Sequence, residues 1–458
     1  MKKEAEHRPF LLVFGGLIVG LVSVAQAWHL LFLLPLFWLA GYNGHRFAIA
    51  LACAAGWFLH AQPPAFVKDS RPYEGVVTLA STTRIYDDAQ TAEATTAEGH
   101  RYRLRLRPDL VVALGDQLRV TGVLRPLREA DEPIARSQGI EGVLIPDDLE
   151  VVAKGPWYFQ WGDAWRRGFL KYVGTYADGT TAATLDALCF NATWNLDEST
   201  WTNLRRTGTT HIISASGLHV VVLGAALAIA LIRLPVPRPV QLLLLLLVLC
   251  VFAGAAGLRP PIVRSVLMVG IGAWSYLLRR ETDWLSALAV AGIITLLVEP
   301  AAVYDIGFQL SYVLVGGITM VVPLRLDAEA GLAKRLKYWL ITGLEASCWA
   351  TVVSLPLVAY HFGGFSIVSP IANLLIAPAL PYIMVPAMLG QFAAGVPWLA
   401  SLALGIPNIL VGWLQFVLDR LGSLPFAYVE TPEFSAYWIP LYYALFLAAF
   451  WRFRARPA

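Results

Sequence analysis

Charged residues and cysteines are both scarce in this sequence. Only 15% of the 458 residues are charged, whereas about a quarter are charged in an average soluble domain. The four cysteines are scattered without metal-ligand or paired spacing, which argues against a disulfide framework and a cysteine-based metal site. The sequence also contains no Gly-x-x-x-x-Gly-Lys loop, so a nucleotide-driven motor would have to be a separate protein.

Apolar residues, by contrast, make up 57% of the chain and give a mean hydropathy of +0.59. They gather in runs long enough to cross a bilayer, which predicts a polytopic α-helical membrane protein. Three runs within residues 1–62 predict N-terminal transmembrane helices, the first of them a retained span because it lacks a small-x-small cleavage site. Lys2, Lys3 and Arg8 place the N-terminus in the cytoplasm and the following segment on the periplasmic side.

A further nine apolar runs predict a multi-span body at residues 208–453. The runs cover residues 209–232, 240–256, 261–278, 285–298, 306–322, 338–360, 367–394, 399–421 and 436–451. Arginine and lysine gather in alternate gaps between them, which is typical of cytoplasmic loops. Pro370, Pro378 and Pro381 predict a broken or re-entrant helix within 367–394.

Residues 68–155 lack the long apolar runs and instead alternate between apolar and polar residues in short stretches separated by turns. This pattern predicts an inserted, periplasmic all-β domain. The expected strands cover residues 76–81, 91–94, 100–107, 117–124, and 142–145 with 149–153. Five short strands in a segment of this length are typical of an OB-like barrel, whose exposed face commonly holds single-stranded nucleic acid.

The third of these strands carries arginine at every second position. Because side chains alternate across a strand, the arginines share one face and the intervening apolar residues share the other. The expected DNA-binding residues are Arg101, Arg103, Arg105 and Arg107, extended by Arg119. Such a stripe matches a phosphate backbone in sign. An ordinary solvated sheet face is the alternative, with Asp87, Asp88, Glu93 and Glu98 as pairing partners for the arginines.

Residues 156–207 combine tryptophan with arginine at helical spacing, as at Trp157, Trp161 and Arg167. This composition predicts amphipathic helices in the headgroup layer of a membrane, or alternatively the rim of a pore.

A polar block follows at residues 205–220, where an apolar run begins. A charged residue in hydrocarbon costs about 2.5–3.5 kcal/mol on insertion scales, so such residues usually line a water-filled path. The expected channel-lining residues here are Arg205, Arg206, His211, Ser214, Ser216 and His219. His211 and His219 lie eight residues apart without a partner at four-residue spacing, which does not favour a metal site.

Polar residues in the later runs extend this expected lining. They are Arg259, Arg264, Gln309, Ser311, His361 and Asn373. Alternatively, Arg264 forms a buried ion pair with Asp305 or Glu299, and the neutral residues form hydrogen bonds between helices.

Four ordered blocks of sequence resemble the ComEC-type competence proteins, the inner-membrane channels for DNA uptake in naturally transformable bacteria. The first block, R-R-T-G-T-T-H-I-I-S-A-S-G-L-H-V, covers residues 205–220. The others are G-L-R-P-P-I-V-R-S-V-L-M at 257–268, Y-D-I-G-F-Q-L-S-Y at 304–312, and P-L-V-A-Y-H-F-G-G-F-S-I-V-S-P-I-A-N-L at 356–374. In the second block Pro261 stands where a serine is usual, and Ser265 where an alanine is. The N-terminal β-domain resembles that of the family by pattern.

This resemblance implies a channel that imports single-stranded DNA across the bacterial inner membrane during natural transformation. It also implies membrane lipid, a periplasmic DNA receptor and a cytoplasmic helicase-like ATPase as partners. Most family members continue into a metallo-β-lactamase-like domain with an H-x-H-x-D-H cluster, which this sequence does not contain. We therefore expect no enzymatic activity and no cofactor. Either the sequence is a truncated form, or strand degradation depends on a separate nuclease.

Two other functions fit the sequence less well. Ser214-Ala215-Ser216-Gly217 resembles the Gly-x-Ser-Gly of rhomboid-type intramembrane proteases, with Ser216 as nucleophile and His361 as base. However, Ser214 replaces the first glycine, and rhomboids lack a large inserted β-domain. A transporter for another solute or polymer is the second alternative.

Overall fold

The computed structural model describes residues 66–86, 89–107, 110–127, 139–214, 216–279, 283–298, 302–303, 305–321, 332–431 and 434–454. The transmembrane helices expected within residues 1–62 lie outside this part of the chain, as do Asp87, Asp88 and Glu299. The chain divides into two compact units. The barrel unit comprises Pro64–Ala273 and Leu375–Leu424, and the second unit comprises Met1–Pro63, Trp274–Leu374 and Pro425–Ala458.

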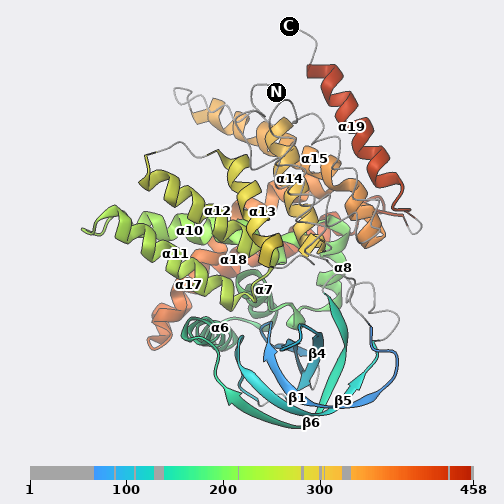
Figure 1. Ribbon diagram of the computed structural model, residues 1–458. Coiled ribbons are helices and arrows are strands. Elements are labelled where there is room, and N and C mark those ends of the chain that lie inside the picture. The colour runs from blue at the N-terminus through green and yellow to red at the C-terminus, as the bar shows by residue number, and fades with distance from the viewer. Residues whose placement is uncertain are drawn as a thin grey trace. The chain divides into compact units, whose positions relative to one another are not determined.

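The barrel unit begins with a six-stranded sheet that closes on itself (Figure 1). Its strands are β1 (Arg71–Leu79), β2 (Arg84–Tyr86), β3 (Ala89–Thr96), β4 (Arg101–Leu106), β5 (Gln117–Arg125) and β6 (Ile140–Ala153). They are ordered β1-β5-β6-β4-β3-β2, and pairing of β1 with β3 closes five of them into a barrel. β4 and β6 pair in parallel, and the other pairs are antiparallel. The expected five-stranded all-β domain is therefore present.

Two details of the sheet differ from the expectation. The short β2 was not expected, and residues 142–145 and 149–153 belong to one continuous strand, β6. The register of β6 shifts opposite Thr121 and Gly122, where a side chain on Gly122 would overlap the backbone at Ile145. A β-bulge of this kind bends a strand without ending it. The interruption in the apolar pattern therefore marks a bend and not a turn.

The helices of the barrel unit come from two segments, the first directly after β6 and the second after residue 374. They are α6 (Trp157–Tyr176), α7 (Gly179–Phe190), η2 (Thr193–Asn195), α8 (Glu198–Thr207), α9 (Thr210–Ile213), α10 (Gly217–Leu231), α11 (Arg238–Ala255), α12 (Pro260–Leu277, which continues into the second unit), η4 (Ala377–Ala379), α17 (Leu380–Gly390), η5 (Gln391–Ala393) and α18 (Pro397–Gly422).

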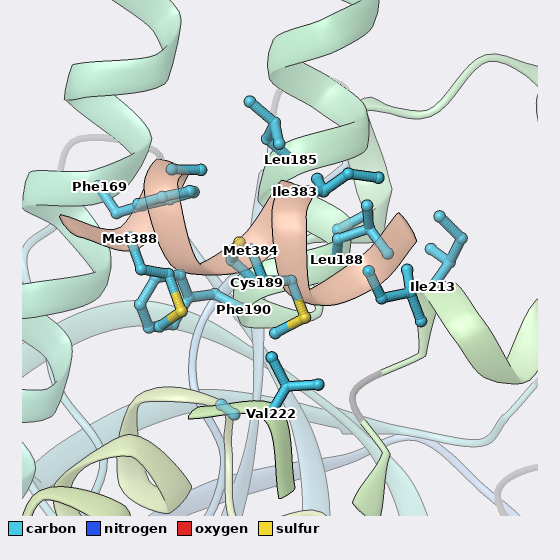
Figure 2. Packing of buried hydrophobic residues seen from close by; sticks show 14 of the residues in the cluster. Phe169, Leu185, Leu188, Cys189, Phe190, Ile213, Val222, Ile383, Met384 and Met388 are labelled. Carbon is cyan, nitrogen blue, oxygen red and sulfur yellow. The ribbon is translucent and has the colours of Figure 1, made fainter. Parts of the chain in front are cut away.

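Helix α7 lies at the centre of this group and is buried on all sides from Thr181 to Phe190. Figure 2 shows Ile383, Met384 and Met388 of α17 among residues of α6, α7, α9 and α10. A helix that is apolar all round is expected to be buried. α7 thus departs from the amphipathic pattern expected for residues 156–207, whereas α6 keeps it.

The second unit contains the remaining described helices and a small sheet. These are α13 (Trp284–Val298), α14 (Ile306–Val321), α15 (Leu332–Phe362), β7 (Gly364–Ser366), α16 (Ser369–Ile376), β8 (Tyr428–Glu430) and α19 (Trp438–Arg454). Gly317 of α14 packs closely against Val353 of α15, where a side chain at position 317 would come within 2.6 Å. The Tyr443 hydroxyl of α19 donates to the Val353 carbonyl at 2.8 Å.

Each of the nine apolar runs expected after residue 208 coincides with helix in the described part of the chain. Among the described residues, four helical segments are long and apolar enough to cross a membrane: Arg238–Ala255, Leu336–Phe362, Ser369–Ala393 and Pro397–Gly422. Within 367–394, where a broken or re-entrant helix was expected, the 3-10 turn η4 at Pro378 lies between α16 and α17, while Ser369–Ala393 remains one candidate span. Proline removes a backbone donor, which explains the interruption.

Candidate nucleic-acid interface

The arginines of β4 point outward from the barrel, as their spacing predicts. Tyr102, Leu104 and Leu106 are buried in the barrel core, whereas Arg101 and Arg103 are half-buried and Arg105 is exposed. Arg107 is exposed just after the strand ends. The alternation follows from the pleat, since the apolar residues need the core. The four arginines therefore lie along one line on the outer surface.

Neighbouring strands add charge of both signs to this outer face. Val143 of β6 pairs with Arg103 on one side and with Arg125 of β5 on the other. Glu93 of β3 is the cross-strand neighbour of Arg103 on the opposite side. Opposite charges on adjacent strands attract each other modestly. The arginine face is thus basic on β4 and β5 but bordered by a carboxylate on β3.

Arg119 does not adjoin the β4 arginines, because β6 lies between β5 and β4. Its Nη1 lies 3.7 Å from Oε2 of Glu150, and both side chains are more than half exposed. Such a surface ion pair contributes little to stability. It does offset the charge of Arg119, which makes this residue the weakest member of the expected phosphate-binding set.

The barrel is fixed to α6 through Asp116, a fully buried carboxylate in the turn before β5. It accepts hydrogen bonds from the backbone N–H groups of Ala113 at 3.0 Å and Gly155 at 2.8 Å, and from Nε2 of Gln160 at 2.6 Å. Burial alone would raise the pKa of Asp116, but these bonds and Lys154 outweigh it and lower the pKa. The charged form of Asp116 therefore holds the start of α6 against the barrel.

A second attachment joins the loop before β2 to the middle of α6. The buried Arg166 donates from Nη1 to the Thr83 carbonyl at 3.0 Å and from Nη2 to the Thr83 hydroxyl at 3.2 Å. Its guanidinium also lies 5.7 Å from the centre of the Trp194 ring in η2. Neither Asp116 nor Arg166 was among the residues expected to be functional, although the Gly115–Asp116 turn is visible in the sequence.

Residues 205–219 form a connection between helices and not the start of one continuous helix. α8 ends at Gly208, which has a φ of 68°. This left-handed conformation is common for glycine at a helix C-terminus. The hydroxyls of Thr207 and Thr209 lie 2.7 Å apart, and both residues are fully buried. The T-G-T sequence therefore builds a fixed turn.

Arg206 stabilises the C-terminal end of α18. Its Nε donates to the Gly422 carbonyl at 2.5 Å, and its Nη2 donates to the Leu424 carbonyl at 2.8 Å. One turn earlier in α8, Asn203 donates from Nδ2 to Asp419 at 2.7 Å. The last carbonyls of a helix lack partners within the helix and carry partial negative charge, so a guanidinium suits them.

The exposed polar side chains among the described residues of this segment are Arg205, His211 and Ser214. Nδ1 of His211 lies 3.1 Å from the Gly208 carbonyl, which keeps the ring close to the turn. These three side chains, from α8, α9 and the residue after α9, are the ones that present charge and hydrogen-bonding groups to the surroundings.

Ser216 and His219 form the N-terminal cap of α10. The backbone N–H of Ser216 donates to Nδ1 of His219 at 3.0 Å, and the Ser216 hydroxyl lies 3.0 Å from the same nitrogen. Because Nδ1 accepts a hydrogen bond, the neutral ring carries its proton on Nε2. His219 is fully buried. Both residues therefore have a defined structural role in this cap.

The start of α10 packs tightly against α12. A side chain on Gly217 would come within 2.5 Å of the Ser265 hydroxyl and 3.3 Å of Nη2 of Arg264. Arg264 is buried at this contact, with 7% of its surface exposed. Arg259 is partly exposed immediately before α12, and its carbonyl accepts from the N–H of Ile262 at 2.9 Å.

Four of the expected channel residues belong to the second unit. Nε2 of His361 in α15 lies 3.1 Å from Oε1 of Gln309 in α14, and Nε2 of Gln309 donates to the Val303 carbonyl at 3.0 Å. Nδ2 of Asn373 donates to the Ser369 hydroxyl at 3.2 Å within α16. Ser311 is partly buried on α14. His361 thus links two helices, a role that does not need the protease mechanism.

Within the described residues, no group of three or more His, Cys, Asp or Glu side chains is arranged to hold a metal ion. One further titratable group, Asp186 of α7, is buried with 5% of its surface exposed. Burial raises its pKa to about 7, against hydrogen bonding from Asn195 and attraction from Arg166. The sequence does not predict this buried carboxyl, because residues 156–207 were expected to form amphipathic helices, on which an Asp would face solvent.

A model of the family described as Competence protein matches residues 188–456. The chain is similar to ComE operon protein 3 of Bacillus subtilis (strain 168), with 26% identity over 57% of this chain and 32% of that protein. It is 30% identical to Competence protein ComA of Neisseria gonorrhoeae over 66% of this chain and 42% of that protein. It is also 29% identical to the uncharacterized protein YcaI of Escherichia coli (strain K12), over 55% of this chain and 34% of that protein.

The chain therefore spans less than half the length of each of these relatives. No solved structure matches it.

Proposed function

The chain belongs to the Competence protein family, and we propose on this basis that it acts in DNA uptake during natural transformation. In this proposal it is a multi-pass protein of the bacterial inner membrane and forms a conduit that imports one DNA strand. The family match over residues 188–456 is the observation that carries the proposal. Four described segments long and apolar enough to cross a membrane support the membrane location.

The arginine face of the barrel supports single-stranded DNA as the substrate. Four outward arginines at two-residue spacing provide cationic contacts along a strand, and neutralising phosphates in this way releases condensed counterions. The order of the five barrel strands, with one parallel pair between β4 and β6, supports an OB-type barrel on the periplasmic side. Exposed aromatic residues are few on this face, so we infer electrostatic binding without sequence preference.

Within residues 205–219 the exposed Arg205, His211 and Ser214 are the proposed contacts with DNA. A polyanion that leaves water needs cationic and hydrogen-bonding groups in place of its hydration shell. Arg206 holds this segment in place by hydrogen bonding to the C-terminal end of α18. Ser216 and His219 do so by capping the start of α10. The charge of Arg205 is thus carried on a rigid connection between helices.

The proposal assigns conduction and not strand degradation to these residues. The degrading nuclease, a DNA receptor outside and a helicase-like ATPase inside are proposed as separate activities. These partners follow from the resemblance to the competence family.

Uptake of radiolabelled DNA into a nuclease-protected form tests the proposed function. A transformable strain that lacks its own copy of the gene is complemented with this chain, and with Arg205→Glu. We expect uptake with the wild type and a strong loss with Arg205→Glu, because repulsion replaces attraction to phosphate. Arg233→Glu, an exposed arginine beyond the end of α10, is the matched control. Equal uptake with and without the wild-type chain would refute the proposal.

A further inference from the structure

Helix α6 has one face in the core and a strongly aromatic opposite face. Phe169, Tyr172 and Val173 are buried in the core of the barrel unit. At the N-terminal end of the other face, Trp157 and Trp161 are 54% and 60% exposed. Their rings contact each other in an edge-to-face arrangement with centroids 4.7 Å apart. An exposed patch of packed tryptophans is typical of a surface that binds a membrane or another molecule.

One end of α6 lies against the end of a candidate membrane span. A side chain on Gly162 would come within 2.9 Å of both the Ala255 nitrogen and the Val251 carbonyl oxygen. These atoms belong to the last turns of α11, which covers the candidate span Arg238–Ala255. Trp161 therefore lies at the level where this span ends.

Further along, α6 contacts the beginning of another candidate span. The Tyr172 hydroxyl donates to the Ala400 carbonyl at 3.0 Å, in the first turn of α18. Gly162 and Tyr172 are ten residues apart, which corresponds to about 15 Å along a helix. The hydrocarbon core of a bilayer is about 30 Å thick. Because α6 cannot bridge that thickness over this distance, the end of α11 and the start of α18 would lie at the same face of a membrane that both segments cross. This arrangement requires a re-entrant segment, not a full crossing, within 367–394.

We propose that α6 is an interfacial anchor, which binds the headgroup layer of an anionic phospholipid membrane through Trp157, Tyr158 and Trp161. Lys171 is exposed further along the same helix and supplies positive charge for anionic headgroups, whereas the charge of Arg167 is offset by Asp163. Tryptophan and tyrosine favour this layer because their rings are apolar and their N–H and O–H groups remain hydrated.

The anchor also fixes the position of the barrel relative to the lipid surface. Asp116 binds the start of α6 through Gly155 and Gln160, and Arg166 binds the barrel loop at Thr83. A barrel held at two points on an interfacial helix cannot rotate freely on a linker. The inference does not depend on DNA transport, since it follows from the contacts of α6 alone.

Site-directed spin labelling of the full-length chain tests the anchor. All four cysteines are first replaced, and the protein is reconstituted in vesicles of phosphatidylethanolamine and phosphatidylglycerol. Trp161→Cys carries the label on α6, and Thr121→Cys carries it on the exposed outer face of β5 as the matched control. Power saturation with oxygen, which partitions into lipid, and with a water-soluble nickel chelate reports the environment of each label.

We expect oxygen accessibility to exceed chelate accessibility several-fold at position 161, and the reverse at position 121. Ala164→Cys, exposed one turn further along α6, replaces the first site if Trp161→Cys does not accumulate. Chelate accessibility at position 161 equal to that at 121 would overturn the proposal. Protection of position 161 only after addition of a thymidine oligonucleotide would also overturn it, and would indicate instead a platform on which DNA bases stack.

Discussion

At the scale of single residues, several polar side chains of the apolar helices form hydrogen bonds to the ends of helices. Arg206 binds the last carbonyls of α18, and Ser216 with His219 caps the start of α10. Polar groups in apolar surroundings are costly unless they find partners. Their occurrence in the polar block at residues 205–220 therefore does not by itself mean that each one contacts DNA. Arg205, His211 and Ser214 are the exposed polar side chains among the described residues of that block.

Arg206→Ala should lower the stability of the protein. The substitution removes two hydrogen bonds from a charged donor and leaves the Gly422 and Leu424 carbonyls without this partner. A hydrogen bond to a charged group contributes about 1.5–3 kcal/mol, so we expect the free energy of unfolding to fall by at least that amount. Thermal unfolding of the purified protein in detergent measures it, with Arg205→Ala as the control. An Arg206→Ala protein as stable as the wild type, yet inactive in uptake, would point to direct contact with DNA.

Asp186 should make the stability depend on pH. Its pKa is raised to about 7 in the folded protein, chiefly by burial, whereas an unfolded Asp titrates near about 3.9. Between these values the folded state binds one more proton than the unfolded state. The free energy of unfolding should therefore fall as pH rises from about 4 to about 7, by about 1.4 kcal/mol per pH unit, and level off above that.

Asp186→Asn should flatten this dependence, as measured by unfolding temperatures between pH 5 and pH 8. Asp197→Asn is the matched control, because hydrogen bonds from Ser199 and Thr200 lower the pKa of Asp197 to about 2. Asp197 contributes to the free energy of unfolding at every pH above the pKa of an unfolded Asp, and this contribution is lost only in more acidic solution. Its substitution should shift the unfolding temperature equally at both ends of the range. A pH profile unchanged by Asp186→Asn would show that Asp186 does not bind this proton.

At the scale of elements, the sequence predicts secondary structure and burial best where a single periodicity runs through a segment. The two-residue alternation of Arg103, Leu104 and Arg105 determines which side chains of β4 face the core. The apolar runs after residue 208 likewise become helices. Composition cannot show that α7 is enclosed by α6, α17 and α18, because α17 and α18 come from a distant part of the chain. The division of residues 205–219 at Gly208 and Ser214 depends on local turns, which a hydropathy pattern does not record.

Charge reversal of Arg103 and Arg105 tests β4 as a DNA-binding element. We expect the full-length protein to bind a fluorescent thymidine oligonucleotide at low salt, with affinity that decreases steeply as salt rises. Arg103→Glu with Arg105→Glu should weaken binding more than tenfold, which corresponds to about 1.4 kcal/mol. Arg119→Glu should have a smaller effect, because Glu150 already offsets that charge. Fluorescence anisotropy measures all three proteins, and undetectable binding by the wild type at low salt would make the arginines an ordinary solvated face.

At the scale of the whole molecule, the expected site residues are distributed over both compact units. Eight of the twelve expected channel residues, from Arg205 to Arg264, belong to the barrel unit, and Gln309, Ser311, His361 and Asn373 belong to the second. The sequence could identify these residues as unusually polar for their surroundings, but not which of them share a unit. That assignment depends on contacts between segments far apart in the chain, such as α8 with α18.

Cysteine accessibility in living cells tests whether residues 205–219 line the route of DNA through the molecule. In a chain without native cysteines, Ser214→Cys should react with a membrane-impermeant thiol reagent, because Ser214 is exposed at the end of α9. Ser216→Cys should react far more slowly, since its side chain lies against the buried His219. Thr121→Cys on the outer face of the barrel shows whether the reagent reaches the protein at all.

DNA that occupies the route should then protect the cysteine at position 214. We expect its labelling to fall when competent cells take up DNA and to recover when uptake ends. Labelling at position 121 should change only if DNA binds to the barrel. The reason is steric, because a strand in contact with Arg205 and His211 covers the neighbouring Ser214. Labelling at 214 that DNA leaves unchanged, in cells with normal uptake, would place the route elsewhere and leave residues 205–219 with the structural role that Arg206 and His219 already have.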